Sequence, residues 1–339
     1  MKRCWLEISQ SHLLHNLKVL RSLLPQGAQV AAVVKANAYG HGAVEVARWL
    51  ESEVAMLAVA NCEEAMELQA AGIQTPILVL GPALPEERST LVEAGFVPSL
   101  SSFAEAQAFN DLGEALGKKV PVHIVIDTGM GRMGIWQEEF SSVFARISKL
   151  PNLVIAGIAT HLPVADEEDD FTNVQLDWVR VELSKVYDMA SGGGTWIHVL
   201  NSAGVEQHAE AAWNMVRLGL ALYGYSPTGR LAEELRPVMT WKTRVTLVRE
   251  IGPGRSISYG RTFVSQKTMK VATLAVGYAD GYPRAVSNRG AEVLLRGRRC
   301  PVLGRVTMDQ VVVDVSEVEE VEVGDEVVLF GEAGKEILP

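Results

Sequence analysis

Polar side chains in this sequence follow short apolar runs at several points along the chain. They are Lys35, Asp127, Arg132, His161, Asn201, Ser202 and Arg217. Each has an ordinary explanation when taken alone, because a lysine after a strand is usually solvated and a lone histidine is more often structural. Their repeated placement at the ends of apolar runs instead indicates that these side chains converge on one site.

Lys35 suggests the chemistry of that site. A lysine amine that emerges from an apolar strand can have its pKa lowered by desolvation, and it can then form a Schiff base with a carbonyl. Ser202 follows the seventh apolar run of the chain, and Gly219 with its backbone N–H follows the eighth. The loops after these two strands are where a barrel of parallel strands commonly binds phosphate. A Schiff-base lysine with a phosphate cradle predicts pyridoxal phosphate (PLP) as the cofactor. An aldolase acting on a sugar phosphate is the alternative.

Eight continuous apolar runs in the first two-thirds of the chain are the elements that would position these residues. They cover residues 30–35, 56–60, 77–80, 96–100, 122–127, 154–160, 196–201 and 215–218. Continuous rather than alternating hydrophobicity is typical of strands buried on both faces, as in a parallel sheet. Helical periodicity lies between the runs, with Ser101 as an expected N-cap and Gly72 as an expected C′ glycine. The helical segments are residues 11–24, 43–50, 63–71, 104–116 and 171–189.

This alternation predicts an α/β fold. Eight strand–helix units in about 220 residues match a (β/α)₈ TIM barrel, whose active site lies at the C-terminal ends of the strands. A doubly wound open sheet usually has fewer strands, and here no GxGxxG follows the first run. Beyond about residue 230, short valine-rich runs alternate with glycine-containing turns, which is typical of a small β domain. We therefore expect a barrel over residues 1–232 and a smaller, mostly β C-terminal domain over residues 233–339, with strands at 245–251, 270–276, 291–295, 311–315 and 327–330.

The composition excludes several classes of protein. Hydrophobic residues make up 48% and charged residues 21% of the 339 positions, a balance that excludes a disordered chain. The net charge of −10 argues against general nucleic-acid binding. Cys4, Cys62 and Cys300 lie far apart, so we expect neither a disulfide framework nor a metal site. No run approaches the roughly 20 apolar residues of a membrane helix, and no signal peptide is visible, so we expect a cytoplasmic protein without a membrane partner.

Short motifs along nearly the whole chain resemble those of bacterial alanine racemases. VKANAYGHG at residues 34–42 resembles the PLP-attachment motif of that family. Seven further motifs follow in the family's order, which makes the resemblance specific: DTGMGRMG (127–134), TH (160–161), NSA (201–203), VRLG (216–219), SYGRT (258–262), VGYADG (276–281) and GRVTMDQ (304–310). The family fold, a barrel followed by a β domain, agrees with the pattern of runs.

The resemblance implies a role for each matching residue. Lys35 would hold PLP covalently and act as one catalytic base, and Tyr259 of the partner subunit would act as the opposite base. Arg217 would face the pyridine nitrogen, with His161 beside the cofactor. The implied cofactor-binding set is Lys35, Tyr39, His161, Asn201, Ser202, Arg217 and Gly219, of which Tyr39, Ser202 and the Gly219 backbone hold the phosphate. Arg132, Tyr278 and the Met308 backbone amide would bind substrate, and Asp166, Arg284, Arg305 and Asp309 would lie at the edge of the site.

The activity implied by the resemblance is the interconversion of L-alanine and D-alanine, which supplies D-alanine for peptidoglycan, in a homodimer with shared active sites. A racemase that prefers serine or accepts a broader range of amino acids is a close alternative. PLP-dependent ornithine and lysine decarboxylases share the architecture, but the SYGRT and GRVTMDQ stretches favour a racemase. The β domain argues against a non-catalytic PLP-binding barrel.

Two positions depart from the family pattern. Many members carry a carbamylated lysine that orients the arginine corresponding to Arg132, but this chain has Val125 there. Arg132 must then be oriented in another way, for example by an anion or water, which leaves the strictness for alanine open. Members usually continue through a last segment whose tyrosine contacts the cofactor phosphate. This chain ends at Pro339 without one, so we expect a C-terminal domain that is shortened at its end.

Overall fold

The computed structural model describes residues 2–190, 194–334 and 336–338. The chain divides into two compact units, one formed by Gln10–Arg236 and the other by Met1–Ser9 with Pro237–Pro339. We refer to them as the barrel unit and the β unit. This division differs from the expected boundary at residues 232 and 233 mainly because the first nine residues join the β unit. Their strand, β1 (Cys4–Ile8), pairs along its whole length with β11 (Met239–Ile251).

The barrel unit contains a closed ring of eight parallel strands, which confirms the fold expected from the continuous apolar runs. The strands are β2 (Gln29–Val33), β3 (Met56–Val59), β4 (Ile77–Val79), β5 (Val97–Leu100), β6 (Val120–Asp127), β8 (Leu153–Ala159), β9 (Trp196–His198) and β10 (Met215–Leu218). Pairings of β5 with β6 and of β10 with β2 close the ring. A two-residue strand, β7 (Ile135–Trp136), pairs with the end of β6.

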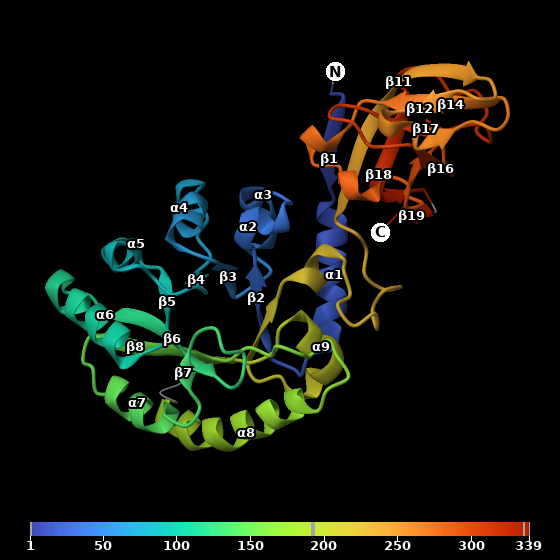
Figure 1. The fold of residues 1–339 in the computed structure, drawn as a ribbon. Helices are drawn as coiled ribbons and strands as arrows, with labels where there is room; N and C mark the ends of the chain where they lie inside the picture. Colours follow the sequence, from blue (N-terminus) through green and yellow to red (C-terminus); the bar gives the residue numbers. More distant parts are fainter. Residues whose placement is uncertain (1, 191–193, 335, 339) are drawn as a thin grey trace. The chain divides into compact units, whose positions relative to one another are not determined.

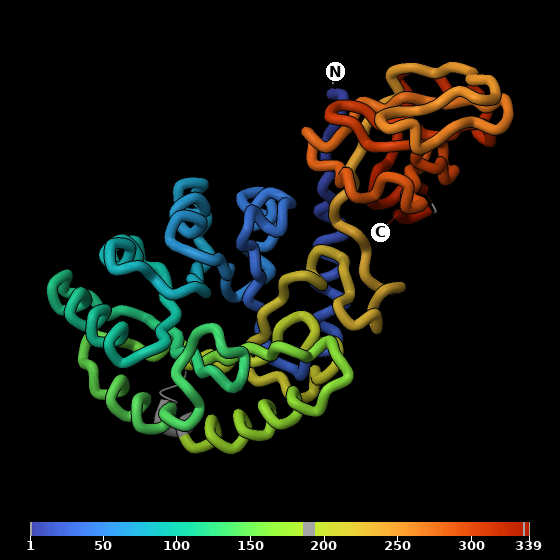
Figure 2. The backbone as a smooth tube through the Cα atoms, in the orientation of Figure 1, coloured from blue at the N-terminus to red at the C-terminus, as the bar shows by residue number. Residues whose placement is uncertain are grey.

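Helices surround these strands, as Figures 1 and 2 show. They are α1 (Gln10–Ser22), α3 (Ala43–Leu50), α4 (Cys62–Ala70), α5 (Arg88–Ala94), α6 (Phe103–Leu116), α7 (Phe140–Ile147), α8 (Phe171–Ala190) and α9 (Ser202–His208), with 3₁₀ turns η1 (Pro85–Glu87), η2 (Ala209–Ala211) and η3 (Leu220–Tyr223). Gly72 follows α4 with a φ of +85°, as expected of a C′ glycine. The expected N-cap Ser101 is wrong, because Ser102 caps α6 by accepting the N–H of Glu105.

The β unit is built around six antiparallel strands that also form a closed ring. They pair in the order β11, β14 (Met269–Leu274), β17 (Val311–Asp314), β16 (Arg298–Leu303), β15 (Glu292–Leu295) and β18 (Glu326–Ala333), and β18 returns to β11. β1 and β19 (Glu336–Leu338) extend this sheet, and a hairpin of β12 (Ser256–Ile257) and β13 (Phe263–Val264) stands apart from it. Valine side chains fill the interior, including Val245, Val293, Val313 and Val327.

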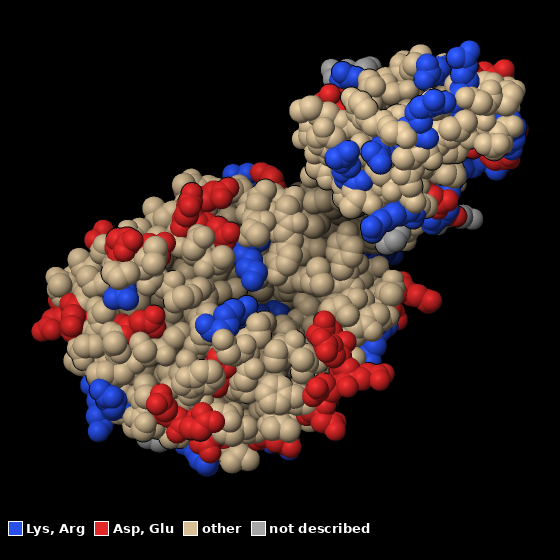
Figure 3. Space-filling model, viewed as in Figure 1, with Lys and Arg blue, Asp and Glu red and all other residues tan. Residues whose placement is uncertain are grey.

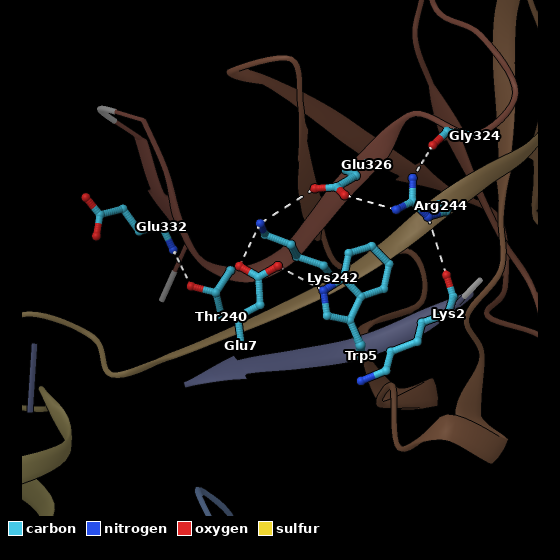
Figure 4. A network of polar contacts seen from close by, with 9 residues as sticks. All are labelled: Lys2, Trp5, Glu7, Thr240, Lys242, Arg244, Gly324, Glu326 and Glu332. Atoms are coloured by element: carbon cyan, nitrogen blue, oxygen red, sulfur yellow. Dashed lines mark hydrogen bonds and ion pairs between the residues drawn. The ribbon is translucent and has the colours of Figure 1, made fainter. Parts of the chain in front are cut away.

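Charged side chains hold β1 on the outside of this ring (Figure 4). Lys242 on β11 forms ion pairs with Glu7 on β1, at 2.8 Å, and with Glu326 on β18, at 3.6 Å. Arg244 adds a second ion pair to Glu326 at 3.0 Å. Exposed pairs of this kind contribute little one by one, so their main effect is to fix the register of β1 against its neighbours.

Among the described residues, none of the helices combines the length and the apolar character needed to cross a bilayer.

Candidate active site

Six of the seven polar residues expected to converge do so at the C-terminal ends of the barrel strands, and Asp127 is the exception. A cavity of about 350 Å³ opens there. The eight barrel-unit residues that the resemblance assigns to the cofactor or the substrate line it, namely Lys35, Tyr39, Arg132, His161, Asn201, Ser202, Arg217 and Gly219, and so does Asp166, which was expected at its edge. The closed ring explains this convergence, because parallel strands direct their C-terminal ends to one side of a barrel.

Lys35 and Tyr39 reach the cavity from a short segment labelled α2 (Lys35–Tyr39), which follows β2. The interpretation of Lys35 as the last residue of a strand is wrong by two residues, since β2 ends at Val33. Residues 36–39 all have φ between 51° and 55°, so the segment is one turn of left-handed helix. Such a turn returns the chain to the same side after about four residues, and both side chains accordingly line the cavity.

Arg217 on β10 is the most deeply buried charge of the site, with 6% of its surface exposed. Its guanidinium donates to His198 Nδ1 at 2.8 Å, to the Thr160 carbonyl at 2.7 Å and to His161 Nδ1 at 3.2 Å. Burial, together with the charge of Arg132, lowers the pKa of Arg217 to about 10. The acceptors named here are neutral, so the guanidinium keeps its full positive charge at the base of the cavity.

Two buried histidines, His123 on β6 and His198 on β9, lie behind Arg217 and were not predicted from the sequence. An arginine can only donate, so His198 Nδ1 must accept and the proton of that ring sits on Nε2. His198 Nε2 then donates to His123 Nδ1 at 2.7 Å. Space for the second ring comes from Gly157, where a Cβ would lie 2.6 Å from the His123 ring atoms. Arg217 therefore sets the tautomers of both rings.

Burial keeps these histidines neutral. The pKa of His123 is lowered to about 3, chiefly by desolvation and further by the Arg217 charge. The same causes lower the pKa of His161 to about 3, with Arg132 and Lys35 contributing, and the pKa of His198 lies well below 6.5. The neutral His161 accepts a hydrogen bond from Arg217, but its low pKa makes it a poor proton acceptor at neutral pH.

These pKa shifts predict that the protein loses stability as the pH falls below about 6.5. The unfolded chain protonates these histidines near their ordinary pKa of 6.5, whereas the folded chain does not until about pH 3. The unfolded state then binds more protons, and each such histidine removes up to about 1.4 kcal/mol of unfolding free energy per pH unit. Urea unfolding from about pH 7 to about pH 5 measures this slope.

His123→Gln is the matched variant for this measurement, since glutamine keeps a polar side chain but does not titrate. Its unfolding free energy is expected to depend less steeply on pH than that of the unaltered protein. Equal slopes for the two proteins would contradict the burial of a neutral His123.

The loops after β9 and β10 form a cradle of hydrogen-bond donors. The Ser202 hydroxyl accepts the N–H groups of Gly219, at 3.0 Å, and Ala221, at 3.3 Å. A Cβ at Gly219 would lie 2.7 Å from the Tyr39 hydroxyl, so only glycine lets that hydroxyl approach. Burial raises the pKa of Tyr39, which keeps it a neutral donor. Asn201 caps α9 by accepting the Gly204 N–H at 2.9 Å. The Ser202 and Tyr39 hydroxyls keep O–H groups that can donate, and the Gly219 and Ala221 N–H groups lie beside Ser202, an arrangement that suits a phosphate group.

Asp127 has a structural role in the loop that carries Arg132. Its carboxylate accepts the backbone N–H groups of Gly129, Gly131 and Arg132 at 2.9 to 3.2 Å. This interaction folds the glycine-rich loop and places the Arg132 side chain in the cavity wall. Val125 lines the same cavity, so the position where the family resemblance implies a lysine presents an apolar side chain here.

The remaining predicted residues belong to the β unit and are described within it: Tyr259, Tyr278 and Met308, with Arg284, Arg305 and Asp309 from the expected edge of the site. All six are exposed, Tyr259 to 68%. The N–H of Tyr278 donates to the Thr307 carbonyl and that of Ala279 to the Met308 carbonyl, both at 3.0 Å. These bonds join the 276–281 and 304–310 motifs. The Ser258 hydroxyl donates to the Arg305 carbonyl, which attaches the Tyr259 turn η4 (Tyr259–Arg261) to the same surface.

Comparison with known proteins agrees with this arrangement. Residues 8–227 match the model of the alanine racemase N-terminal domain, and residues 238–338 match that of the C-terminal domain. An alanine racemase of Methylacidiphilum infernorum is 41% identical over 335 residues, which cover 98% of this chain and 85% of the relative. The solved alanine racemase of Clostridium difficile 630 superimposes with a TM-score of 0.90 at 36% identity, over 98% of this chain and 88% of that one.

A third relative was solved with its cofactor. The alanine racemase of Bartonella henselae with covalently bound pyridoxal phosphate superimposes with a TM-score of 0.87 at 27% identity, over 98% of this chain and 91% of that one. The domain models together span both units, and the fold and the motifs agree with them. The chain belongs to the alanine racemase family.

Proposed function

We propose that this protein is a PLP-dependent alanine racemase that uses two bases and supplies D-alanine for peptidoglycan. The observation that carries the proposal is the convergence of eight family residues on one barrel cavity. The sequence resemblance named these residues from motifs that lie up to 184 positions apart, from Lys35 to Gly219, and the fold brings them together.

The cavity fits pyridoxal phosphate. The Lys35 amine and the Ser202, Gly219 and Tyr39 donors suit the aldehyde and the phosphate of the cofactor, respectively. When bound, PLP supplies an electron sink for the charge left on the substrate Cα. Arg217 stays protonated at neutral pH, because its pKa of about 10 lies well above 7. A cation in this position would leave the pyridine nitrogen of the bound cofactor unprotonated, which would weaken the sink and favour plain racemisation over side reactions.

Racemisation needs a proton acceptor on each face of the Cα. Lys35 provides one from the barrel cavity, where His161 is a weak base because its pKa is about 3. We assign the opposite face to Tyr259, whose phenol is exposed on the β unit. Arg305 lies beside the Tyr259 turn, 3.0 Å from a Cβ built at Gly260.

A homodimer with shared sites follows from this assignment, with Tyr259 of the partner subunit completing each cavity. The charges of the two units support contact between the barrel unit of one protomer and the β unit of its partner. The barrel unit carries 27 acidic and 15 basic residues, and the β unit carries 14 acidic and 16 basic residues. Figure 3 shows acidic groups spread over the barrel unit and basic groups on the β unit. Opposite charge favours contact between one protomer's barrel and its partner's β unit.

Complementation between two inactive variants tests the shared site. Lys35→Ala and Tyr259→Phe are each expected to be inactive as homodimers. A heterodimer of the two contains one site with both substitutions and one with neither, so mixed subunits are expected to regain activity. The measurement is racemase activity of differently tagged, purified heterodimers. Verified heterodimers that stay inactive would count against sharing.

Chiral analysis of the products from several amino acids tests the proposed activity. The expected result is rapid conversion of L-alanine to D-alanine and back, with slower conversion of serine and larger amino acids. Val125 motivates the second candidate, a serine or broad-specificity racemase, because Arg132 shares its cavity wall with an apolar residue. Comparable rates for alanine and serine would favour that candidate. Amine products would indicate a decarboxylase and overturn both.

A further inference from the structure

The left-handed turn that carries Lys35 and Tyr39 is built mostly from residues that resist this conformation, with Asn37 as the exception. Ala36, Asn37, Ala38 and Tyr39 have φ values of 51°, 53°, 52° and 55°. Left-handed helical geometry brings the Cβ of an L-residue against the following carbonyl, and runs of such residues are rare outside glycine. No glycine stands among these four. The surrounding structure must therefore hold the turn in place.

Glu64 holds the first residue of the turn. One carboxylate oxygen accepts the N–H of Ala36 at 2.7 Å, and the other accepts the N–H of Ala60 at 2.7 Å. Ala60 follows directly on β3, so the carboxylate links the turn to the end of the neighbouring barrel strand. Glu64 is itself fixed, because its N–H donates to the N-cap Asn61 of α4 at 3.0 Å.

His41 holds the last residues of the turn. Its Nδ1–H donates to the carbonyls of Ala38, at 2.9 Å, and of Tyr39, at 3.1 Å. The imidazole packs on the Tyr223 ring with centroids 4.5 Å apart, and Tyr223 packs on Tyr39 at 5.0 Å. The Tyr223 hydroxyl donates to the Val33 carbonyl at the end of β2. The turn is therefore clamped at both ends against the barrel strands.

The clamp bears directly on the cavity. Lys35 precedes the strained residues and Tyr39 is the last of them, and both line the cavity. The handedness of the turn sets the separation between the lysine amine and the Tyr39 hydroxyl, which lies against Gly219 in the donor cradle. Release of the turn into a relaxed conformation would change that separation while the rest of the barrel keeps its fold.

We propose that Glu64 is a positioning residue for the cofactor, which acts by clamping the left-handed turn so that Lys35 and Tyr39 engage the two ends of one PLP molecule. The proposal rests on the proposed function, because it takes PLP as the ligand of the cavity. His41 supports the other end of the turn. In this role the Glu64 carboxylate contacts neither the cofactor nor the substrate and takes part in no proton transfer.

Three variants at α4 test the clamp. Glu64→Ala leaves both N–H groups without a protein acceptor, Glu64→Gln keeps one acceptor oxygen, and Glu63→Ala removes an exposed neighbouring carboxylate as the matched control. Hydrogen bonds to a charged group contribute enough that we expect Glu64→Ala to weaken PLP binding by about ten- to a hundredfold. Glu64→Gln should fall between, and Glu63→Ala should match the unaltered protein. Equilibrium dialysis of the apoprotein against PLP measures this.

Ala36→Gly separates positioning from general stability. Glycine adopts positive φ without strain, and Ala36 is exposed, so this variant keeps its packing and relaxes the turn. Its melting temperature as apoprotein is expected to rise by about 1–3 °C, while its PLP affinity stays close to that of the unaltered protein, because Glu64 still accepts the N–H of residue 36. The control, Ala145→Gly in the right-handed helix α7, should lower the melting temperature and leave PLP affinity unchanged.

These measurements distinguish failure of the clamp from failure of the proposed function. Failure of the unaltered protein to bind PLP would overturn the proposed function and, with it, this inference. PLP affinity that stays normal in Glu64→Ala, or a fall in affinity that merely follows a fall in melting temperature in every variant, would overturn the clamp alone. A lowered melting temperature in Ala36→Gly would show that the turn is not strained. Should Glu64→Ala not fold, Glu64→Gln and Ala36→Gly still decide the question.

Discussion

Lys35→Ala is expected to abolish covalent attachment of PLP. Among the described residues that line the barrel cavity, Lys35 is the only lysine, so no other amine there can form a Schiff base with the cofactor aldehyde. The Ser202 and Gly219 donors remain, and we therefore expect weak, reversible binding of the cofactor to persist. Borohydride reduction followed by peptide mass spectrometry measures the attachment.

The control for this experiment is Lys149→Ala, which removes an exposed lysine that does not line the cavity. It should retain a reduced cofactor on the peptide that contains residue 35. Activity of Lys35→Ala should fall by at least the factor of about 10²–10⁴ that is typical of losing a general base. A cofactor mass on any other lysine peptide would show that the attachment site has been assigned wrongly.

The fold of the barrel unit could be predicted from the sequence because its strands are buried on both faces. Runs such as 30–35 and 56–60 contain aliphatic residues on both sides of the strand, a pattern that few other elements share. β1 was missed because none of Cys4–Ile8 is fully buried and because it pairs with a strand more than 230 positions away. β16 was missed because it begins with Arg298 and Arg299, whose side chains lie outside the ring. For β1, a partner strand that lies so far along the chain leaves no signal in the local sequence.

The site was predictable wherever a polar residue interrupts the apolar pattern at the end of a strand. Lys35, His161 and Arg217 all carry that signal. His123 and His198 do not, because each lies within an apolar run, and only the pairing of β6 and β9 on either side of β8 brings His123 Nδ1 and His198 Nε2 to 2.7 Å. The available signal was a histidine within an apolar run that is otherwise typical of a buried strand. Such a histidine predicts a buried hydrogen-bond partner, because buried polar groups are nearly always hydrogen-bonded.

The left-handed turn and the role of Asp127 illustrate what sequence patterns leave undetermined. Among residues 36–39 only Asn37 is of a type that often adopts positive φ, and the groups that hold the turn are Glu64 on α4 and His41, which packs on the Tyr223 ring. Asp127 was interpreted as one of the converging polar groups. Its two oxygens accept three backbone N–H groups of the following loop, which is a loop-forming role that type and spacing alone do not separate from chemistry.

Tyr259→Phe is expected to slow proton exchange at one face of the Cα far more than at the other. Phenylalanine keeps the ring and removes the hydroxyl that we assign as one of the two bases. Lys35 is intact in this variant, so either enantiomer can still join the cofactor, and the lysine face can still exchange its proton. By family resemblance the lysine face is that of D-alanine.

The size and direction of this effect follow from one base on each face. Loss of a general base costs about 10²–10⁴-fold, so the variant should take up solvent deuterium into D-alanine readily and into L-alanine much more slowly. Net racemisation should fall with the slower exchange. Proton NMR of each enantiomer in deuterated buffer measures both rates, and Tyr278→Phe, at another exposed tyrosine of the β unit, should not produce the same asymmetry. Equal slowing for the two enantiomers would argue for a single shared base, because one acceptor that serves both faces would lose both exchanges together.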